Sequence, residues 1–440
     1  MPKILFIQPT QYASDGTLCK QRRIFLPGLA FPLLAALTPD HWEVEVCLEV
    51  VDDVDWDTDA DIVAIGTMGH AALHGLEIAK KFKARGKTVV MGGYMASMVV
   101  DTALTVVDSV VRGDAEISYP ALLCDFERTG RLARVYDNPV ADLNGLPLPR
   151  YELLLDKPIG DMLPVMAGRG CPHLCSFCSI ACVYQGRYLT RRLDEVLRDI
   201  EQVRRLGFDR FYLIDDNIVG NPGFLEQLSE EIAPLGMRWS SQCSLQLARN
   251  PRLLEKVAAS GCEILSFGLE SISQDNLDSL QKQWVKVDEH EALLGRIAGA
   301  GIVPSTEMMV GLDSDTEDSI RATLEFVERN QIPIPRYYIL TPMPGSELYQ
   351  EFRRDGRLVH EDWARYTGTE AVHRPALMSP EMLTEMYWWI NRQTFSLRSI
   401  FKRIVTNRML WKNPFMLAFS LVVNLHYRRY VRRGVTPNIF

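Results

Sequence analysis

The chain contains the stretch Gly170-Cys171-Pro172-His173-Leu174-Cys175-Ser176-Phe177-Cys178, which follows directly on an apolar run at 163–167. Its spacing, CxxxCxxC, lets three thiolates converge on one soft-metal centre from a single loop. A closed structural zinc site needs four protein ligands, so a set of three favours an iron–sulfur cluster with one iron open for a substrate or cosubstrate. The alternative is a zinc site completed by Cys182 or His173.

This motif resembles that of the radical SAM superfamily, in which an aromatic residue stands just before the third cysteine, as Phe177 does here. The resemblance implies that Cys171, Cys175 and Cys178 bind a [4Fe-4S] cluster. It also implies that S-adenosyl-L-methionine (SAM) binds the open iron, with Phe177 near the adenine. Cleavage of SAM, driven by an external electron donor such as flavodoxin or ferredoxin, would produce a 5'-deoxyadenosyl radical that abstracts hydrogen from unactivated carbon.

The residues after the motif alternate between predicted helices and short apolar strands. Six strands are expected, with helices between most of them, at 163–167, 211–214, 238–243, 264–269, 302–310 and 337–340. This order matches the partial (β/α)6 barrel that the resemblance implies. Its active site is expected at the carboxyl ends of the strands, as in complete barrels.

Polar residues stand at several of these strand ends. Asp215, Asp216 and Asn217 close the second strand, where the family receives the amino group of SAM, although the usual Gly-Gly-Glu is absent here. Carboxylates are suitable acceptors for an ammonium group. Gln242 ends the third strand, and Glu270 ends the fourth, where the family binds the ribose hydroxyls. The alternative role for Asn217 and Glu270 is that of a helix N-cap.

The N-terminal third predicts a separate α/β domain with a parallel sheet. Short, mostly apolar strands alternate with stretches long enough for helices, the clearest of which are at 29–37 and 71–85. The strands are expected at 4–7, 44–50, 62–65, 89–91 and 109–111. Glu45 and Glu49 interrupt the second strand. This alternation indicates an edge strand with one face exposed to solvent. Ligands of such sheets lie beyond the carboxyl ends of the strands.

A parallel α/β domain before a radical SAM barrel resembles the cobalamin-binding class of these enzymes, and the segments 110–116 and 341–349 support this resemblance. It implies a flavodoxin-like (Rossmann-type) domain that binds cobalamin. The DxHxxG sequence that supplies a histidine to cobalt is absent, and we interpret His74 as an ordinary helix residue. The expected cobalamin contacts are Gln8, Pro9, Thr10, Thr67, Met68, Gly69, His70, Gly92, Gly93, Tyr94, Gly113 and Glu116.

Composition and charge limit the cellular compartment and the classes of partner that the protein can have. The nine cysteines among 440 residues are an odd number, which fits a reducing, cytoplasmic compartment better than a disulfide framework. Of the net charge of −8, the segment 387–440 contributes ten Lys and Arg residues and no acid, so the remainder carries −18. This acidic body argues against a nucleic-acid partner.

The apolar run 414–425 is too short to span a bilayer, but it suits a helix lying on a membrane surface. The alternative is a helical layer that packs on the barrel.

Together with the strand and helix pattern, the resemblance implies a cobalamin-binding domain at 1–140, a linker at 141–160, a radical SAM barrel at 161–375 and a basic helical region at 376–440. The predicted function is methylation of an unactivated carbon through methylcobalamin and a 5'-deoxyadenosyl radical. The expected substrate is a small molecule of hydrophobic or membrane-derived character, with a peripheral membrane location for the protein. One alternative is a cyclase, oxidase or rearrangement enzyme of the same class, and another is a zinc-stabilised non-catalytic binding module.

Overall fold

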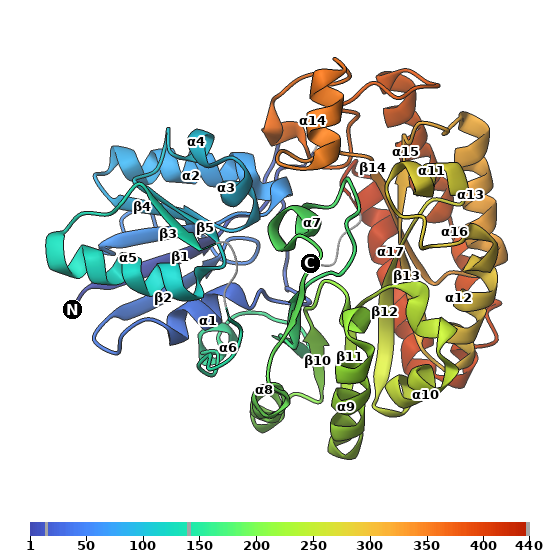
Figure 1. Cartoon of the computed structure of the whole chain (residues 1–440), viewed down its shortest axis with the longest axis horizontal. Coiled ribbons are helices and arrows are strands. Elements are labelled where there is room, and N and C mark those ends of the chain that lie inside the picture. The colour runs from blue at the N-terminus through green and yellow to red at the C-terminus, as the bar shows by residue number, and fades with distance from the viewer. Residues whose placement is uncertain (14–15, 139–141, 437–440) are drawn as a thin grey trace. The chain divides into compact units, whose positions relative to one another are not determined.

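The computed structural model describes residues 1–13, 16–138 and 142–436, which form two compact units. The first unit comprises Met1–Pro164 and the later segment Asp362–Thr367. The second comprises Val165–Glu361 and residues 368–436. The predicted linker at 141–160 contains a short helix, α6 (Glu152–Leu155), and groups with the first unit (Figure 1).

The first unit is built on a six-stranded sheet in which every strand pair is parallel. Its strand order is β2-β1-β3-β4-β5-β6, so the order reverses between β1 and β3, where such sheets place their ligands. The strands are β1 (Lys3–Gln8), β2 (Glu43–Leu48), β3 (Ile62–Gly66), β4 (Thr88–Gly92), β5 (Ser109–Gly113) and β6 (Val135–Asn138). β2 is an edge strand, as predicted. β6 was not predicted, because its four residues include two polar ones and form no apolar run.

Helices cover both faces of this sheet (Figure 1). In that view α2 (Ala72–Ala84), α3 (Tyr94–Met98) and α4 (Val100–Ala103) lie on one side, and α1 (Ala30–Ala36) and α5 (Ala115–Thr129) on the other. The core between sheet and helices is apolar: Ile78, Ala79 and Phe82 of α2 pack on buried valines and isoleucines of the strands. Burying these side chains is the main favourable contribution to folding of the unit.

The second unit contains a second six-stranded sheet, in the order β14-β13-β12-β11-β10-β7. The strands are β7 (Met162–Val165), β10 (Arg210–Leu213), β11 (Arg238–Cys243), β12 (Cys262–Glu270), β13 (Val303–Val310) and β14 (Ile334–Ile339). The helices between them are α8 (Leu193–Arg205), α9 (Pro222–Ile232), α10 (Pro251–Ala259), α11 (Gln274–Ser279), α12 (His290–Gly299) and α13 (Glu317–Arg329). All six predicted strands are present. β14 begins three residues before its predicted start, because an edge strand tolerates Pro335.

A short antiparallel hairpin precedes α8 and was not predicted. It pairs β8 (Gly168–Gly170) with β9 (Tyr188–Thr190), and the cysteine motif and α7 (Ser179–Tyr184) lie in the loop between them. Two glycines in a three-residue strand carry no apolar periodicity, so the sequence gives no sign of β8. The hairpin matters because it brings the two ends of the cysteine loop together.

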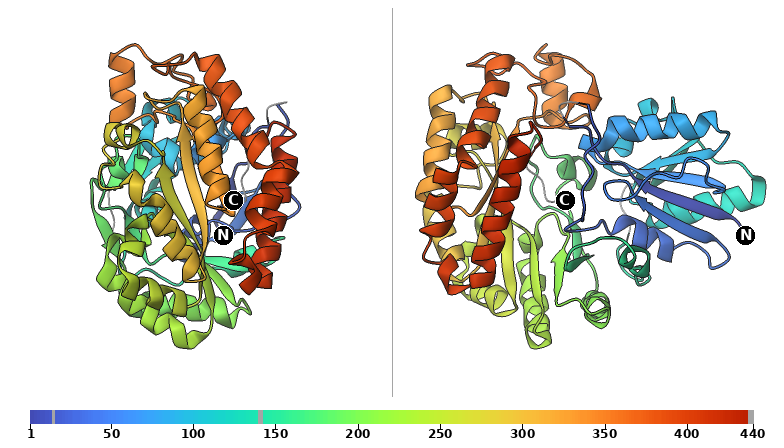
Figure 2. Two further views of the ribbon diagram at one scale, coloured as in Figure 1. Left: turned by 90° about the vertical axis from the view of Figure 1, so that its right-hand side faces the viewer. Right: turned by 180° about the vertical axis from the view of Figure 1, so that it is seen from behind.

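The C-terminal region packs on the second unit. It contains α14 (Glu347–Arg354), α15 (Pro380–Thr394), α16 (Leu397–Ile400), a π-helical turn (Phe401–Val405) and α17 (Pro414–Val431), most of which is red in Figure 2. One face of α17 is buried with Val303 of β13 and Ile334 of β14 in a shared apolar cluster. No described helix combines the length and apolar character needed to cross a bilayer.

A buried arginine fastens this region to the sheet. The side chain of Arg403 is inaccessible to solvent, and it donates hydrogen bonds to the carbonyl oxygens of Ile332 and Thr394 and to Asn424 Oδ1, each at 2.8 Å. Burial lowers the pKa of Arg403 to about 10. Because a buried charge is costly unless it is hydrogen-bonded, this network holds α15, the π-helical turn and α17 in one arrangement.

Candidate cluster and cofactor site

The cysteine loop begins at a position that only glycine can occupy. Gly170, the last residue of β8, has φ +90°, and a Cβ added there would lie 2.3 Å from the carbonyl oxygen of Arg187. Both the left-handed backbone and this close approach exclude a side chain. Gly170 therefore lets the loop leave the hairpin directly at Cys171.

The carboxylates of two adjacent aspartates, which follow β10, form hydrogen bonds with this hairpin. Asp215, which follows β10, accepts the backbone N–H of Ala167 at Oδ1 (2.9 Å) and the hydroxyl of Tyr188 at Oδ2 (2.7 Å). Asp216 Oδ2 accepts the backbone N–H of Gly170 at 2.7 Å. Burial raises the pKa of Asp215 to about 7. Asp215 thus has both oxygens engaged inside the protein, and it ties the two strands of the hairpin to β10.

Asn217 reaches the first cysteine directly. Its Nδ2 donates to Cys171 Sγ at 3.6 Å, and its Oδ1 accepts the backbone N–H of Ser244 at 3.0 Å. No capping hydrogen bond from Asn217 to the following helical turn is present among the described contacts. The N-cap alternative is therefore wrong for Asn217, whose amide links the cysteine loop to the end of β11.

The three cysteines lie close enough to influence one another. Burial is the main cause that raises the pKa of Cys175 to about 11 and that of Cys178 to about 12, and electrostatic interaction with Cys171 contributes to both values. Apolar surroundings therefore disfavour free thiolates here. Bound iron removes this penalty, because a coordinating thiol is deprotonated by the metal charge. The donor set fits a thiolate-held cluster.

A single metal ion fits the cysteine loop less well than an iron–sulfur cluster does. Among residues 1–13, 16–138 and 142–436, no three His, Cys, Asp or Glu side chains are close enough together to hold one metal ion. A cubane presents separate iron atoms, so its cysteines need not meet at one point. Of the two proposed fourth zinc ligands, His173 is stacked on Trp284 with ring centroids 3.6 Å apart, and Cys182 Sγ donates to the carbonyl oxygen of Cys178 at 3.5 Å.

A buried ion pair lies beside the cysteines. Lys282 Nζ donates to Glu270 Oε1 at 2.7 Å and to the carbonyl oxygen of Gly268 at 2.8 Å, and both charged side chains are at most 10% exposed. Although burial opposes it, the negative charges of Glu270, Cys175 and Cys178 hold the pKa of Lys282 above its usual value. Lys282 was not predicted, because no motif marks it in the sequence.

The backbone at Glu270 is itself unusual. Glu270 has φ +62°, and the pairing of β12 with β13 shifts register between Gly268 and Glu270. Non-glycine residues in this conformation are strained and concentrate at functional sites. The distortion directs the carboxylate toward Lys282, so the N-cap alternative is wrong for Glu270. Ser273 caps the next helix, α11.

The other predicted SAM contacts lie at the same end of the sheet. Phe177 is half-buried and packs against a cluster of buried leucines that includes Leu280, Leu312 and Leu340. Gln242, near the end of β11, is exposed. The structure therefore places an apolar wall and an exposed amide, which hydrogen-bonds Tyr212, near the carboxyl ends of these strands.

In the first unit, the loops after the strands form an exposed rim. The backbone N–H of Thr67 donates to the carbonyl oxygen of Gly92 at 3.0 Å, which joins the loops after β3 and β4. Gly93 is exposed with φ +88°, and a Cβ there would lie 2.8 Å from the carbonyl oxygen of Thr67. Met68 is 56% exposed beside it. Glycine at this position therefore lets the loops after β3 and β4 pack directly against each other and leaves backbone exposed at the rim.

Other predicted contacts differ in accessibility. Gln8, Gly69, Tyr94 and Gly113 are partly exposed, whereas Pro9, Thr10, Thr67 and Glu116 are buried. The Thr10 hydroxyl donates to the carbonyl oxygen of Cys19 at 2.7 Å and so serves the fold of its own loop. The side chain of His70 lies outside the described part of the structure.

His74 is more than an ordinary helix residue. It is 3% exposed, and its Nε2 lies 2.8 Å from Glu49 Oε1, while its Nδ1 lies 3.1 Å from the hydroxyl of Tyr12. Glu49 Oε2 also accepts the backbone N–H of Thr10 at 2.9 Å. Although burial opposes both charges, the contact with Glu49 raises the pKa of His74, and the contact with His74 lowers that of Glu49. The network fixes the loop after β1.

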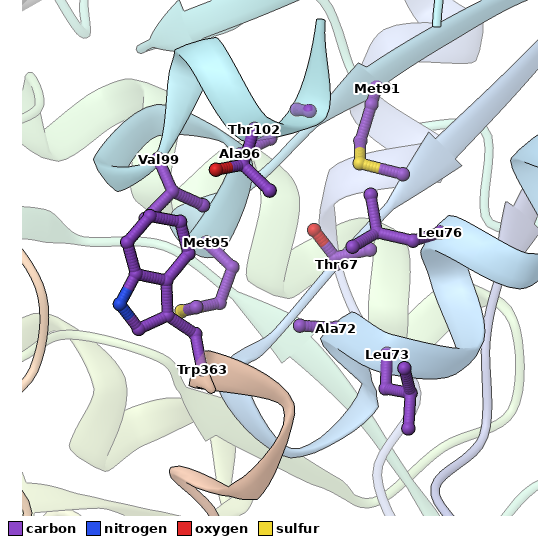
Figure 3. A pocket seen from close by; sticks show the side chains of 11 residues that line it. Thr67, Ala72, Leu73, Leu76, Met91, Met95, Ala96, Val99, Thr102 and Trp363 are labelled. Atoms are coloured by element: carbon purple, nitrogen blue, oxygen red, sulfur yellow. The ribbon is translucent and has the colours of Figure 1, made fainter. Parts of the chain in front are cut away.

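The first unit also contains an apolar pocket, shown in Figure 3. Side chains of α2, β4, α3 and α4 line it, and Trp363 forms one wall beside Met95 and Val99. Trp363 belongs to the segment Asp362–Thr367, which joins the first unit from far along the chain. Although Trp363 is only half-buried, its indole contributes a large apolar contact that anchors this segment.

Comparison with known proteins identifies the superfamily. Residues 165–327 match the family model described as the radical SAM superfamily. The chain is 30% identical over 388 residues to bacteriochlorophyllide d C-12(1)-methyltransferase of Chlorobaculum tepidum, covering 86% of this chain and 82% of that protein. It is 25% identical to hopanoid C-2 methylase of Rhodopseudomonas palustris, covering 82% and 72%.

Solved structures share the fold. The radical SAM methyltransferase TsrM of Kitasatospora setae, solved with its tryptophan substrate and a SAM analogue, superposes with a TM-score of 0.69 at 15% identity, covering 98% of each chain. The cobalamin-dependent radical SAM enzyme OxsB superposes with a TM-score of 0.69 at 13% identity, covering 100% of this chain and 73% of that one.

These matches exclude the non-catalytic zinc module, because the family model covers the cysteine loop and the relatives match along most of the chain. The resemblance that the motif indicated is confirmed. The chain belongs to the radical SAM superfamily of enzymes, in the family of the Chlorobaculum tepidum methyltransferase.

Proposed function

We propose that this protein is a cobalamin-dependent radical SAM methyltransferase that adds a methyl group to an unactivated carbon of a hydrophobic, ring-containing molecule. The observation that carries this proposal is the match along most of both chains to a C-methyltransferase, in a chain that also carries the three-cysteine loop. Related methylases are named for bacteriochlorophyllides and hopanoids, which are large apolar ring systems. We infer a substrate of similar chemistry.

In the second unit, Cys171, Cys175 and Cys178 hold the cluster, and Asp215 and Asp216 position their loop. When bound, the cluster supplies the electron that cleaves SAM at its open iron. The hydrogen bonds from Ala167, Tyr188 and Gly170 occupy Asp215 and one oxygen of Asp216, so we assign these residues to positioning the loop rather than to the SAM ammonium.

SAM itself is held, in this proposal, by the groups around Glu270. The carboxylate of Glu270 accepts hydrogen bonds from the ribose hydroxyls, and the hydrogen bond from Lys282 orients it. Phe177 packs on the adenine from the side of the leucine cluster. Gln242, exposed at the end of β11, remains available to a polar group of SAM or substrate.

In the first unit, the rim of bare backbone is the proposed cobalamin site. When bound there, cobalamin carries the methyl group between SAM and substrate. The contacts come from Gln8, from 67–69, from 92–94 and from Gly113, mostly through backbone groups. His74 does not serve as a cobalt ligand, because both of its nitrogens contact Glu49 or Tyr12. The loop Gln8-Pro9-Thr10-Gln11-Tyr12 after β1 supplies no histidine that could bind cobalt.

Anaerobic turnover with SAM, cobalamin, a reductant and a pigment and lipid extract tests the function. We expect a product heavier by one methyl group, together with S-adenosylhomocysteine and 5'-deoxyadenosine in equal amounts, because one SAM gives its methyl group and a second is cleaved. Mass spectrometry of the products measures both. Formation of 5'-deoxyadenosine with product but without S-adenosylhomocysteine would contradict methyl transfer and support a cyclase, oxidase or rearrangement enzyme.

Replacing Cys171, Cys175 or Cys178 with alanine should abolish cluster binding. After anaerobic reconstitution the wild-type protein is expected to be brown, with about four irons per chain, while each variant retains little iron and forms no 5'-deoxyadenosine. Cys182→Ala is the matched control, since this thiol lies in the same loop but four residues beyond Cys178 and outside the motif, and its loss should leave iron content unchanged. Loss of iron in the control and not in the three variants would refute the assignment.

Lys282→Met should leave Glu270 as a buried carboxylate without its cation. We expect a loss of about 3–5 kcal/mol in unfolding free energy, measured by urea denaturation, and at least a tenfold loss of SAM cleavage with iron content retained. The double variant Glu270→Gln/Lys282→Met should recover most of the stability, because no charge is then left unpaired. It should not recover cleavage. Recovery of both stability and SAM cleavage would show that the Glu270–Lys282 pair serves only to stabilise the fold.

A further inference from the structure

The solvent-facing side of α17 carries a continuous apolar stripe. Trp411, just before the helix, is followed by Phe415, Ala418, Val422 and Leu425, at alternating spacings of four and three residues. All five are exposed, and the four large side chains are 59%, 45%, 58% and 44% accessible, respectively. This spacing places them on one face of a helix. We name these five residues the outer stripe.

The opposite face of α17 is already buried. Met416, Val423, Tyr427 and Val431 pack in the cluster that joins this helix to the sheet of the second unit. A surface helix of a soluble protein normally opposes such a face with polar residues. α17 is apolar on both sides over three turns, although its outer side borders solvent. Figure 2 shows α17, in red, at the surface of its unit.

Basic residues stand at both ends of the outer stripe. Arg408 and Lys412 precede it, and Arg429, Arg432 and Arg433 follow it, and all five are exposed. The sequence contains no Asp or Glu from position 387 to its end. The Arg210 guanidinium also lies 4.2 Å from the ring centre of Phe415, but it pairs with Asp209 and Glu263 and adds no further charge to this face. An occupant of this face therefore has to accept apolar side chains and positive charge together.

A second copy of the chain does not meet this requirement. A two-fold interface joins the same patch of both copies, so the basic ends of the stripe would face basic ends whether the helices ran parallel or antiparallel. Like charges brought together in this way destabilise an interface. The five basic side chains instead need negative groups on the opposing surface.

We propose that the outer stripe of α17 docks this enzyme on the surface of a membrane that contains anionic lipids. The helix would lie in the plane of the interface, with Trp411, Phe415, Val422 and Leu425 among the upper acyl chains. Arg429, Arg432 and Arg433 at one end and Arg408 and Lys412 at the other would contact lipid phosphates. Eighteen residues make α17 about 27 Å long, so both basic ends can reach headgroups at once. This inference does not depend on the proposed reaction.

Vesicle flotation with the full chain tests the proposal. We expect binding to vesicles of phosphatidylcholine and phosphatidylglycerol in equal parts, and little binding to phosphatidylcholine alone. Arg429→Ser/Arg432→Ser/Arg433→Ser should weaken binding by roughly a hundredfold, and added salt should weaken wild-type binding, because both reduce the electrostatic attraction. Val422→Ser/Leu425→Ser should weaken it by about tenfold, because less apolar surface is inserted.

The matched control is Ile117→Ser/Leu155→Ser, which removes two exposed apolar side chains of the first unit and should leave binding unchanged. Equal iron content after reconstitution and equal unfolding midpoints show that each variant is folded. Absence of vesicle binding, or equal binding to neutral and anionic vesicles, would overturn the proposal. So would a concentration-dependent dimer that Val422→Ser/Leu425→Ser abolishes while the wild type ignores vesicles.

Discussion

The hydrogen bonds that Asp215 and Asp216 accept from the backbone of Ala167 and Gly170 set the geometry of the cluster loop. A loop that carries three cysteines has to hold them in place before iron binds, since ordering it afterwards would cost conformational entropy. The carboxylates do this from the end of a buried strand, and the hydroxyl of Tyr188 completes the link to the returning strand of the hairpin.

The groups around the cysteine loop also affect the charge of its thiols. Buried thiols are reluctant to ionise, and the raised pKa values of Cys175 and Cys178 express this. Lys282 supplies a buried positive charge within electrostatic reach of both cysteines and in direct contact with Glu270. The strained backbone at Glu270 persists because Lys282 and the register shift in β12 hold its carboxylate in one direction. The charges of Lys282, Glu270 and the cluster cysteines therefore influence one another.

Sequence patterns predicted the two parallel sheets and the cysteine loop because both depend on local signals. Apolar runs mark buried strands, and the spacing of Cys171, Cys175 and Cys178 is itself the motif. The patterns missed β6 and the β8–β9 hairpin, whose short strands have no periodicity. They also missed Lys282 and the network of His74, because these side chains meet partners that no motif connects to them. Asp215 and Asp216 were found from their place after a strand, but their hydrogen bonds to the hairpin could only be seen in three dimensions.

The central claim is that this preorganised loop holds a cluster with one iron open to SAM. Electron paramagnetic resonance of the reduced, anaerobically reconstituted protein, recorded before and after addition of SAM, tests it most directly. The account predicts the signal of a reduced [4Fe-4S] cluster whose g-values change when SAM is added, because SAM binds iron itself. A cluster signal identical with and without saturating SAM, or no cluster signal at all, would contradict the claim.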